Sequence, residues 1–205
     1  MTGDLDAALA ALDAANAEDP RTVTVDGESW PAELLYARRM RAWLDRLYPE
    51  ASDALRLAAS AQHVRRWEIP RGDYPEGRDG YLRWRTHLKR HHAKVAAGIL
   101  HDAGCDAATI RRVQTLVRKQ GIKTDPETQA LEDVIGVVFL DSYAADFVAK
   151  HDEAKVVRIL AKTWAKMSAT GRDAALTLDL PPRVRTLVER ALAGHGGADE
   201  TVPER

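Results

Sequence analysis

The chain has 205 residues, of which 45% are hydrophobic and 30% are charged, a composition typical of a globular protein with a buried core. Its 30 Lys and Arg nearly balance its 31 Asp and Glu, and this excludes a protein that binds nucleic acid or membranes through an overall basic surface. Cys105 is the only cysteine, which excludes an internal disulfide and favours the reducing cytoplasm. The apolar run at residues 134–140 is too short to span a bilayer, so we expect no membrane partner.

Hydrophobic periodicity predicts an all-α fold, a bundle of about seven or eight helices. Proline, glycine and capping residues place the helices at about 4–17, 29–48, 52–63, 79–104, 106–121, 125–140, 152–167 and 182–194. At most one short β-hairpin is expected, near residues 22–30, where alternating residues flank Asp26 and Gly27. We expect a single domain over residues 1–193 and a disordered tail over residues 194–205.

Acidic and imidazole side chains on separate predicted helices are candidates for one metal site. They are Glu33, His63, the adjacent His91 and His92, and Asp133. Helical bundles build metal sites from inward-facing side chains of different helices, and nitrogen and oxygen ligands without cysteine suit Mn, Fe, Ni, Co or Zn.

Each of these residues also has a structural interpretation. Glu33 lies where a carboxylate stabilises the first turn of a helix. His63 is then a hydrogen-bonded core histidine or a cap at the end of its helix, and His91 and His92 are partly exposed on a basic helix. Asp133 lies in a helix that is apolar on all sides, so a buried carboxylate there needs a cation or several hydrogen-bond donors.

A basic segment rich in aromatic residues follows His63. Residues 65–94 contain nine Lys and Arg against four Asp and Glu, which gives a net charge of +5. Arginine recognises phosphate through two parallel hydrogen bonds, and aromatic rings can stack on a base. The predicted phosphate-binding residues are Arg65, Arg66, Arg71, Arg85 and Lys89. The alternative is a solvated basic face whose aromatic residues fill the core, as Trp84 on the apolar stripe suggests.

Three stretches of the chain resemble a known family. They are VDGESWPAELLYARRM, AQHVRRWEIPR and YPEGRDGYLRWRTHLKRHHAKVAAGIL. They resemble a bacterial and fungal family known as domain of unknown function 4202, and the resemblance extends from the first helix to about Leu192. It implies no established activity.

The order and spacing of the helices also resemble, more distantly, the HD-domain metal phosphohydrolases. Those proteins place a histidine, a His-Asp pair, a further histidine and a distal aspartate on successive helices. The resemblance implies that His63 is the histidine of the pair, that His92 is the later histidine, and that Asp133 is the distal aspartate. Glu33 stands in the place of the first histidine, and Val64 replaces the aspartate of the pair. The resemblance therefore implies one metal ion rather than two.

The same resemblance separates the two adjacent histidines, which helical periodicity alone does not. Counted from His92, the small residues 96–97 and the Ile-Leu pair 99–100 fall where the family pattern has them. His92 is then the implied metal ligand. His91 is expected to face the basic segment, where it contacts a substrate phosphate or only solvent.

Three interpretations of function follow. The first is a cytoplasmic, HD-like, metal-binding protein that hydrolyses a nucleotide or another phosphorylated small molecule, with no catalytic residue assigned beyond the metal and phosphate ligands. The second is a non-catalytic module on the same fold that binds a small ligand or RNA. The third is an iron-dependent oxygenase, since HD-like scaffolds also host such chemistry. Elemental analysis of the protein without a tag separates the second interpretation from the other two.

Overall fold

The computed structural model describes residues 4–122 and 124–193, which form ten α-helices, two short 3-10 helices and one β-hairpin. The chain divides into two compact units, Met1–Leu131 and Glu132–Arg205, and each is described by itself. The mostly helical fold with one short hairpin confirms the predicted fold class. Residues 194–205, for which a tail is expected, lie outside the described residues.

The first unit contains five complete helices and the hairpin. Its elements are α1 (Leu5–Ala17), β1 (Thr22–Val25), β2 (Glu28–Pro31), α2 (Ala32–Leu47), α3 (Asp53–Ser60), the 3-10 helices η1 (Arg66–Glu68) and η2 (Arg71–Asp73), α4 (Gly77–Asp102) and α5 (Ala107–Val117). Helix α6 (Pro126–Ser142) continues from this unit into the second. The second unit then contains α7 (Ala144–Lys150), α8 (Glu153–Lys166), α9 (Ala169–Leu176) and α10 (Pro182–Ala193).

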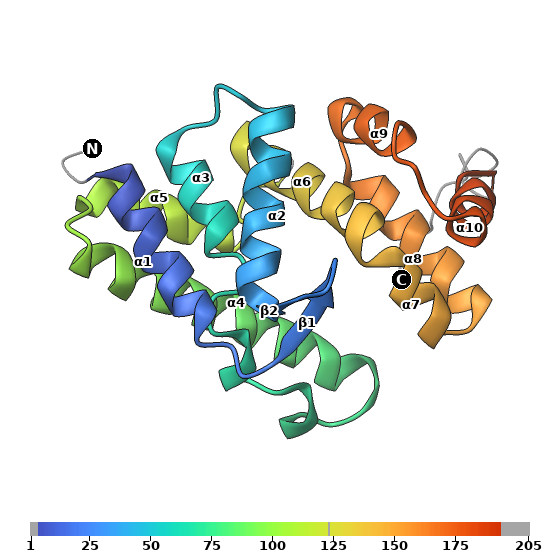
Figure 1. Ribbon diagram of the computed structural model, residues 1–205, viewed down its shortest axis with the longest axis horizontal. Coiled ribbons are helices and arrows are strands. Elements are labelled where there is room, and N and C mark those ends of the chain that lie inside the picture. Colours follow the sequence, from blue (N-terminus) through green and yellow to red (C-terminus); the bar gives the residue numbers. More distant parts are fainter. Residues whose placement is uncertain (1–3, 123, 194–205) are drawn as a thin grey trace, which may run out of the picture. The chain divides into compact units, whose positions relative to one another are not determined.

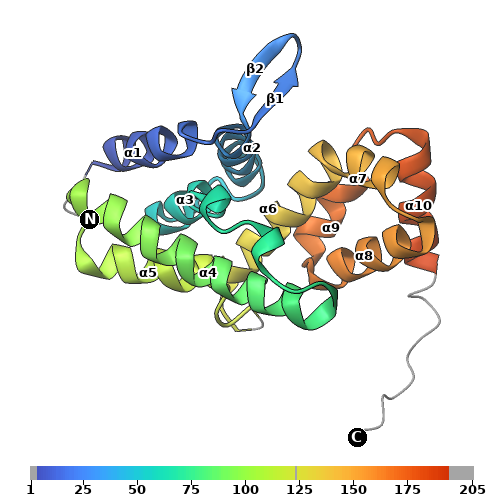
Figure 2. The same cartoon turned by 90° about the horizontal axis from the view of Figure 1, so that it is seen from below.

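The core of the first unit lies between two layers of helices. Helices α1, α2 and α3 pack side by side (Figure 1), and the antiparallel pair α4 and α5 covers α1 and α3 (Figure 2). Large apolar side chains from all five helices meet there with no more than 3% of their surface exposed: Leu12, Met40, Leu44, Leu55, Leu57, Leu88, Leu100, Val113 and Leu116. Burial of these apolar faces, rather than helix propensity, stabilises helices of this length.

Capping residues begin and end several helices where the sequence predicts. The carboxylate of Asp106 accepts hydrogen bonds from the backbone N–H groups of Ala108 and Thr109, which begins α5. Gly104 adopts a positive φ of +79° just after α4, as a residue that closes a helix often does. These two features confirm the predicted break between α4 and α5.

The hairpin precedes α2 and projects away from the helices of its unit (Figure 2). Asp26 and Gly27 both have a positive φ, as the two central residues of a type I′ turn require. The predicted start of the next helix was wrong by a few residues, because strand β2 extends to Pro31. The backbone N–H of Ala32 still donates to the carbonyl of Arg21, so the two chain segments remain paired until α2 begins.

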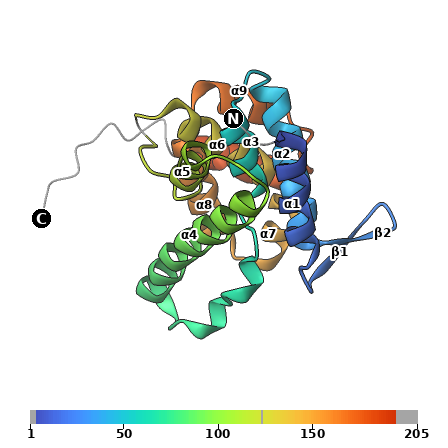
Figure 3. The same ribbon diagram turned by 90° about the vertical axis from the view of Figure 1, so that its left-hand side faces the viewer.

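Helix α3 ends earlier than predicted, and His63 lies beyond its end. The helix stops at Ser60, and residues 61–65 form a turn that leads into η1. This connection runs beside the N-terminal half of α4 (Figure 3), where the indole N–H of Trp84 donates to the carbonyl of Ile69. His63 therefore lies in a turn and not on the apolar face of a helix.

The second unit contains two short helices, α7 and α9, that the sequence pattern did not predict, because they lie in the intervals between the predicted helices. Ser168 begins α9, and its hydroxyl accepts the N–H of Gly171. Helix α10 packs against α7 and α8. In residues 4–122 and 124–193, no helix is both long enough and apolar enough to cross a membrane.

Candidate metal and phosphate site

Two adjacent histidines of α4 hold the turn that follows α3. His92 Nδ1 lies 2.8 Å from the carbonyl oxygen of Val64, and His91 Nε2 lies 3.1 Å from the carbonyl oxygen of Arg65. Arg65 adopts a left-handed φ of +51°, which is rare outside glycine. The turn is therefore fixed by hydrogen bonds from α4 to two successive carbonyls.

His92 is a neutral imidazole with one nitrogen left unused. Only 3% of the residue is exposed, and this burial, together with the nearby His63, lowers its pKa to about 3. Because a carbonyl only accepts hydrogen bonds, Nδ1 carries the proton and Nε2 carries a lone pair. Nε2 is buried and has no hydrogen-bond partner among the described residues. A buried polar atom without a partner costs free energy, so a ligand that binds the lone pair of Nε2 would stabilise the protein.

The ring of His63 lies next to that of His92, with 5.9 Å between the ring centroids. It stacks on Tyr36 at 4.1 Å, and its Nδ1 lies 3.2 Å from Oε2 of Glu33. Burial lowers the pKa of His63 more than the Glu33 carboxylate raises it, so this imidazole is also neutral near pH 7. The structure thus brings together Glu33, His63 and His92, three of the four predicted metal ligands.

Both oxygens of the Glu33 carboxylate are already in contact with protein donors. Oε1 accepts a hydrogen bond of 2.7 Å from Nη2 of Arg21, and Oε2 faces His63. Burial raises the pKa of Glu33, but the contacts with His63, Arg21 and Arg66 outweigh it and lower the pKa to about 2. Glu33 is therefore ionised, and its environment fits a group that orients His63.

Asp19 and Arg21 complete this cluster, and neither residue was predicted from the sequence to be part of the site. The buried carboxylate of Asp19 accepts hydrogen bonds from the backbone N–H and guanidinium of Arg21 and from the backbone N–H of Glu33. The only signal in the sequence is an Asp-Pro-Arg string between the first helix and the hairpin, which reads as an ordinary turn.

Among the predicted phosphate-binding residues, Arg66 has the guanidinium best placed to bind an anion. Its guanidinium lies 4.9 Å from the centre of the Trp84 ring, and its Nε lies 4.0 Å from Oε1 of Glu33. Within the described residues its side chain donates no hydrogen bond, so its donors are available to a ligand. Burial lowers the pKa of this guanidinium, and the nearby Glu33 carboxylate only partly offsets that effect.

The other predicted cations contact protein groups. Arg65 pairs with Glu18 and lies near Glu68, Arg71 donates to the carbonyls of Tyr74 and Pro75, Arg85 donates to the hydroxyl of Tyr81, and His91 lies 3.3 Å from Glu68. Lys89 is half-buried on α4. Arg71 in particular holds the connection between α3 and α4 in shape, so its guanidinium is less available than sequence alone implies.

Asp133 belongs to the second unit and is completely buried. Its carboxylate accepts hydrogen bonds from the backbone N–H of Ser168 at 2.7 Å and from the Ser168 hydroxyl at 2.5 Å. This contact supplies donors of the kind that a buried carboxylate needs, in line with the structural interpretation of this residue.

No group of three or more His, Cys, Asp or Glu with metal-binding geometry occurs among residues 4–122 and 124–193. A metal site at His63 and His92 would therefore need further ligands from water or from a bound substrate.

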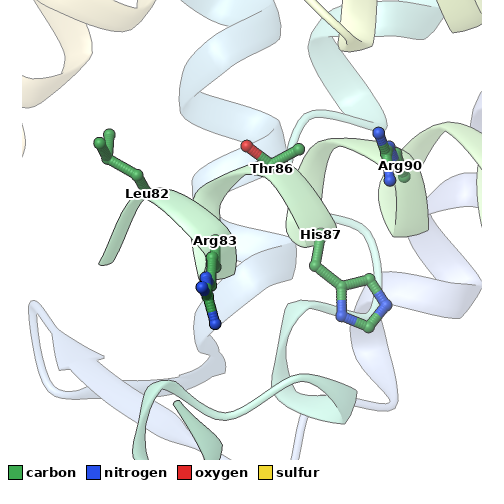
Figure 4. Close-up of a pocket in the computed structure, with 5 residues that line it drawn as sticks. All are labelled: Leu82, Arg83, Thr86, His87 and Arg90. Atoms are coloured by element: carbon green, nitrogen blue, oxygen red, sulfur yellow. The ribbon is translucent and has the colours of Figure 1, made fainter. Parts of the chain in front are cut away.

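An open hollow of about 420 Å³ also lies on the outer face of α4 (Figure 4). Its lining consists of Leu82, Arg83, Thr86, His87 and Arg90. It contains neither His63 nor His92, and a single helix contributes all of its lining residues, so it is a basic surface patch rather than a centre of chemistry.

Fold and site together define a mostly helical protein in which a histidine of a turn, His63, lies next to a histidine of a long helix, His92. Arg66 follows in the same connection and packs on Trp84. The chain belongs to the family described as a domain of unknown function, DUF4202, whose model matches residues 6–188. This match confirms the first of the two resemblances seen in the sequence. No curated protein and no solved structure matches the chain.

Proposed function

We propose that the protein binds one divalent transition metal ion at His63 and His92 and hydrolyses a phosphorylated small molecule, such as a nucleotide, whose phosphate is held by Arg66. The observation that carries this proposal is the buried Nε2 of His92, which has no partner among the described residues and lies in the ring next to His63. We keep the predicted cytoplasm as the proposed compartment.

The state of the two imidazoles supports a metal ligand role. A histidine that binds a metal through one nitrogen usually donates its other N–H to a carboxylate or a carbonyl. Here His63 has Glu33 as that acceptor and His92 has Val64. Two imidazoles with oxygen atoms from water or substrate suit Mn, Fe, Ni, Co or Zn. When bound, such an ion polarises a phosphoryl oxygen and lowers the pKa of a bound water.

Burial argues against acid–base chemistry at His92. A general acid or base works best when its pKa lies near the working pH, and the pKa of His92 is about 3. A neutral imidazole that is shielded from water can still donate its lone pair to a cation. Metal binding is therefore the better use of this side chain.

Arg66 supports the phosphate part of the proposal. The Trp84 ring limits the motion of its guanidinium, and partial burial strengthens the attraction between the guanidinium and an anion. A phosphate bound to Arg66 would also lie near His63, because Nε of Arg66 is 4.0 Å from the Glu33 carboxylate that contacts His63.

A non-catalytic ligand- or RNA-binding module is the second candidate, and one observation favours it. Val64, which stands where HD enzymes have a metal-binding aspartate, is completely buried and apolar. A site that lacks this carboxylate holds its ion with fewer ligands, and it has lost a group that helps to activate water.

Phosphate release from a panel of nucleotides and sugar phosphates, with Mn²⁺ or Zn²⁺ present, tests the proposal. We expect R66Q to raise KM by about 10- to 100-fold, the loss of one or two charge-assisted hydrogen bonds, at unchanged metal content. R65Q is the matched control, since Arg65 already pairs with Glu18, and it should keep the KM of the wild type. Metal binding without release from any substrate would favour the binding module, and an equal effect of R65Q and R66Q would move the phosphate site away from Arg66.

A further inference from the structure

Three charged residues form a chain of contacts that ends on His63. Asp19 binds the guanidinium of Arg21, Arg21 binds Oε1 of Glu33, and Oε2 of Glu33 faces Nδ1 of His63. Both carboxylates are buried, and Asp19 also fixes the backbone N–H of Glu33 at the first turn of α2. These contacts connect the segment between α1 and the hairpin, through α2, to a single imidazole nitrogen.

We infer that Glu33 is a positioning residue rather than a metal ligand, and that with Arg21 and Asp19 it holds His63 as the Nδ1–H tautomer, so that both histidines of the pair offer Nε2. This inference rests on the proposed metal site and revises the predicted role of Glu33 in it.

The hydrogen-bonding capacity of the groups leads to this assignment. The Glu33 carboxylate accepts from the Arg21 guanidinium at 2.7 Å, and as the ionised partner of that cation it has no proton to donate, so its contact with His63 places the proton on Nδ1. A neutral imidazole carries one proton, so Nε2 of His63 then carries a lone pair. The carbonyl of Val64 imposes the same tautomer on His92. The two rings are thus prepared in the same way by two different acceptors.

Direct coordination of a metal by Glu33 would disturb the series of contacts from Asp19 to His63. To bind a metal, an oxygen of Glu33 would have to share with the metal the charge that it now directs at Arg21 or His63. It would thereby weaken a buried network in which each member satisfies the next, and such losses are costly. The positioning role keeps all of these contacts.

The isosteric variant E33Q gives a test with opposite outcomes for the two roles. Arg21 can only donate hydrogen bonds, so the amide oxygen of the introduced glutamine should face Arg21 and its amide NH₂ should face His63. Nδ1 of His63 must then accept, and its proton moves to Nε2. The shape of the side chain is retained, while the nitrogen offered to the metal is blocked.

Long-range ¹H–¹⁵N correlation spectra report the tautomer of each histidine in the metal-free protein at about pH 7.5, where both imidazoles are neutral. We expect both His63 and His92 to be Nδ1–H in the wild type, a readout that requires no variant. In E33Q we expect His63 to be Nε2–H, His92 to be unchanged, and Zn²⁺ affinity to be about 10- to 100-fold lower. E18Q is the control, because Glu18 is an exposed carboxylate that pairs with Arg65, and neither tautomer nor affinity should change.

Three other results would each overturn either this inference or the proposed function. An Nε2–H tautomer of His63 in the wild type would overturn the inference. Loss of metal in E33Q with His63 still Nδ1–H would also overturn it, because Glu33 would then be a ligand. The predicted tautomers in a protein that binds no metal would confirm the positioning by Glu33 and would overturn the proposed function.

Discussion

His92 combines a structural contact with an unused nitrogen in one side chain. Its Nδ1–H donates a hydrogen bond to the Val64 carbonyl, and the burial of the ring keeps it neutral by lowering its pKa. The sequence alone could not choose between His91 and His92, because both lie at the edges of the apolar stripe; the HD-like register chose His92. The structure places His92 inside and leaves His91 partly exposed against Glu68. Periodicity could not reveal Asp19 and Arg21, because their contacts with Glu33 arise where the hairpin reverses the chain.

Protonation of His92 should make the metal-free protein less stable in mild acid. The folded protein binds a proton at His92 with a pKa of about 3, whereas the unfolded chain binds it near 6.5. Between these values the unfolded state binds more protons. The contribution of His92 to the free energy of unfolding is therefore fully present above about pH 6.5 and is lost as the pH is lowered toward 3. Glu33 acts in the same direction at lower pH, from its usual 4.5 to about 2.

Urea unfolding at about pH 7.5, 6.5 and 5.5 measures this effect before Glu33 contributes. We expect H92Q to unfold at lower urea at the highest pH and to lose part of the dependence on pH over this interval, the remainder coming from His63, whose pKa is also lowered by burial. H101Q is the control, because the side chain of His101 is 82% exposed, and it should follow the wild type. The same pH dependence in H92Q and in the wild type would show that other groups cause it.

The helices themselves show what sequence patterns can and cannot locate. Breaks made by glycine or by a capping carboxylate, such as Gly104 and Asp106, were predicted to within a few residues. The end of α8 near residue 167 was predicted, but helix α9 was not. Helix α9 begins at Ser168, whose N–H and hydroxyl both donate to the carboxylate of Asp133 in α6, a contact across 35 residues of sequence.

A glycine of α9 makes this contact possible and provides a test at the level of the helix. A Cβ on Gly171 would lie 2.7 Å from the carboxylate of Asp133, closer than real atoms approach. We expect G171A to lower the free energy of unfolding by about 1–3 kcal/mol, although alanine is the better helix former. G98A is the matched control: Gly98 is an exposed glycine of α4 with open space around it, and alanine there should stabilise by about 0.5–1 kcal/mol.

Thermal and urea unfolding monitored by circular dichroism compare the two variants. Opposite signs of the change in stability support the role of the contact between Asp133 and α9. Equal stabilisation by both substitutions would mean that Asp133 moves aside at little cost, and that Ser168 begins α9 without it.

At the scale of the whole molecule, composition and periodicity were sufficient for the fold class but not for the chemistry. The balance of apolar and charged residues and the scarcity of strand signals predicted a helical protein with one hairpin, and this was confirmed. Membership of the DUF4202 family extends over residues 6–188. The site depends instead on which polar atoms have hydrogen-bond partners, and sequence patterns do not reveal this. The structure shows that Nε2 of His92 has no partner among the described residues, whereas the guanidinium of Arg71 donates to two carbonyls.

Metal content shows directly whether His92 is a metal ligand. Untagged wild type, H92A and H91A, grown in medium supplemented with Mn, Fe, Co, Ni and Zn, should be compared by elemental analysis after confirmation of equal helicity. The account predicts bound metal in the wild type and in H91A and none in H92A, since His91 uses its Nε2 to hold the Arg65 carbonyl. Metal-free wild-type protein, or metal that stays in H92A and leaves with H91A, would contradict it.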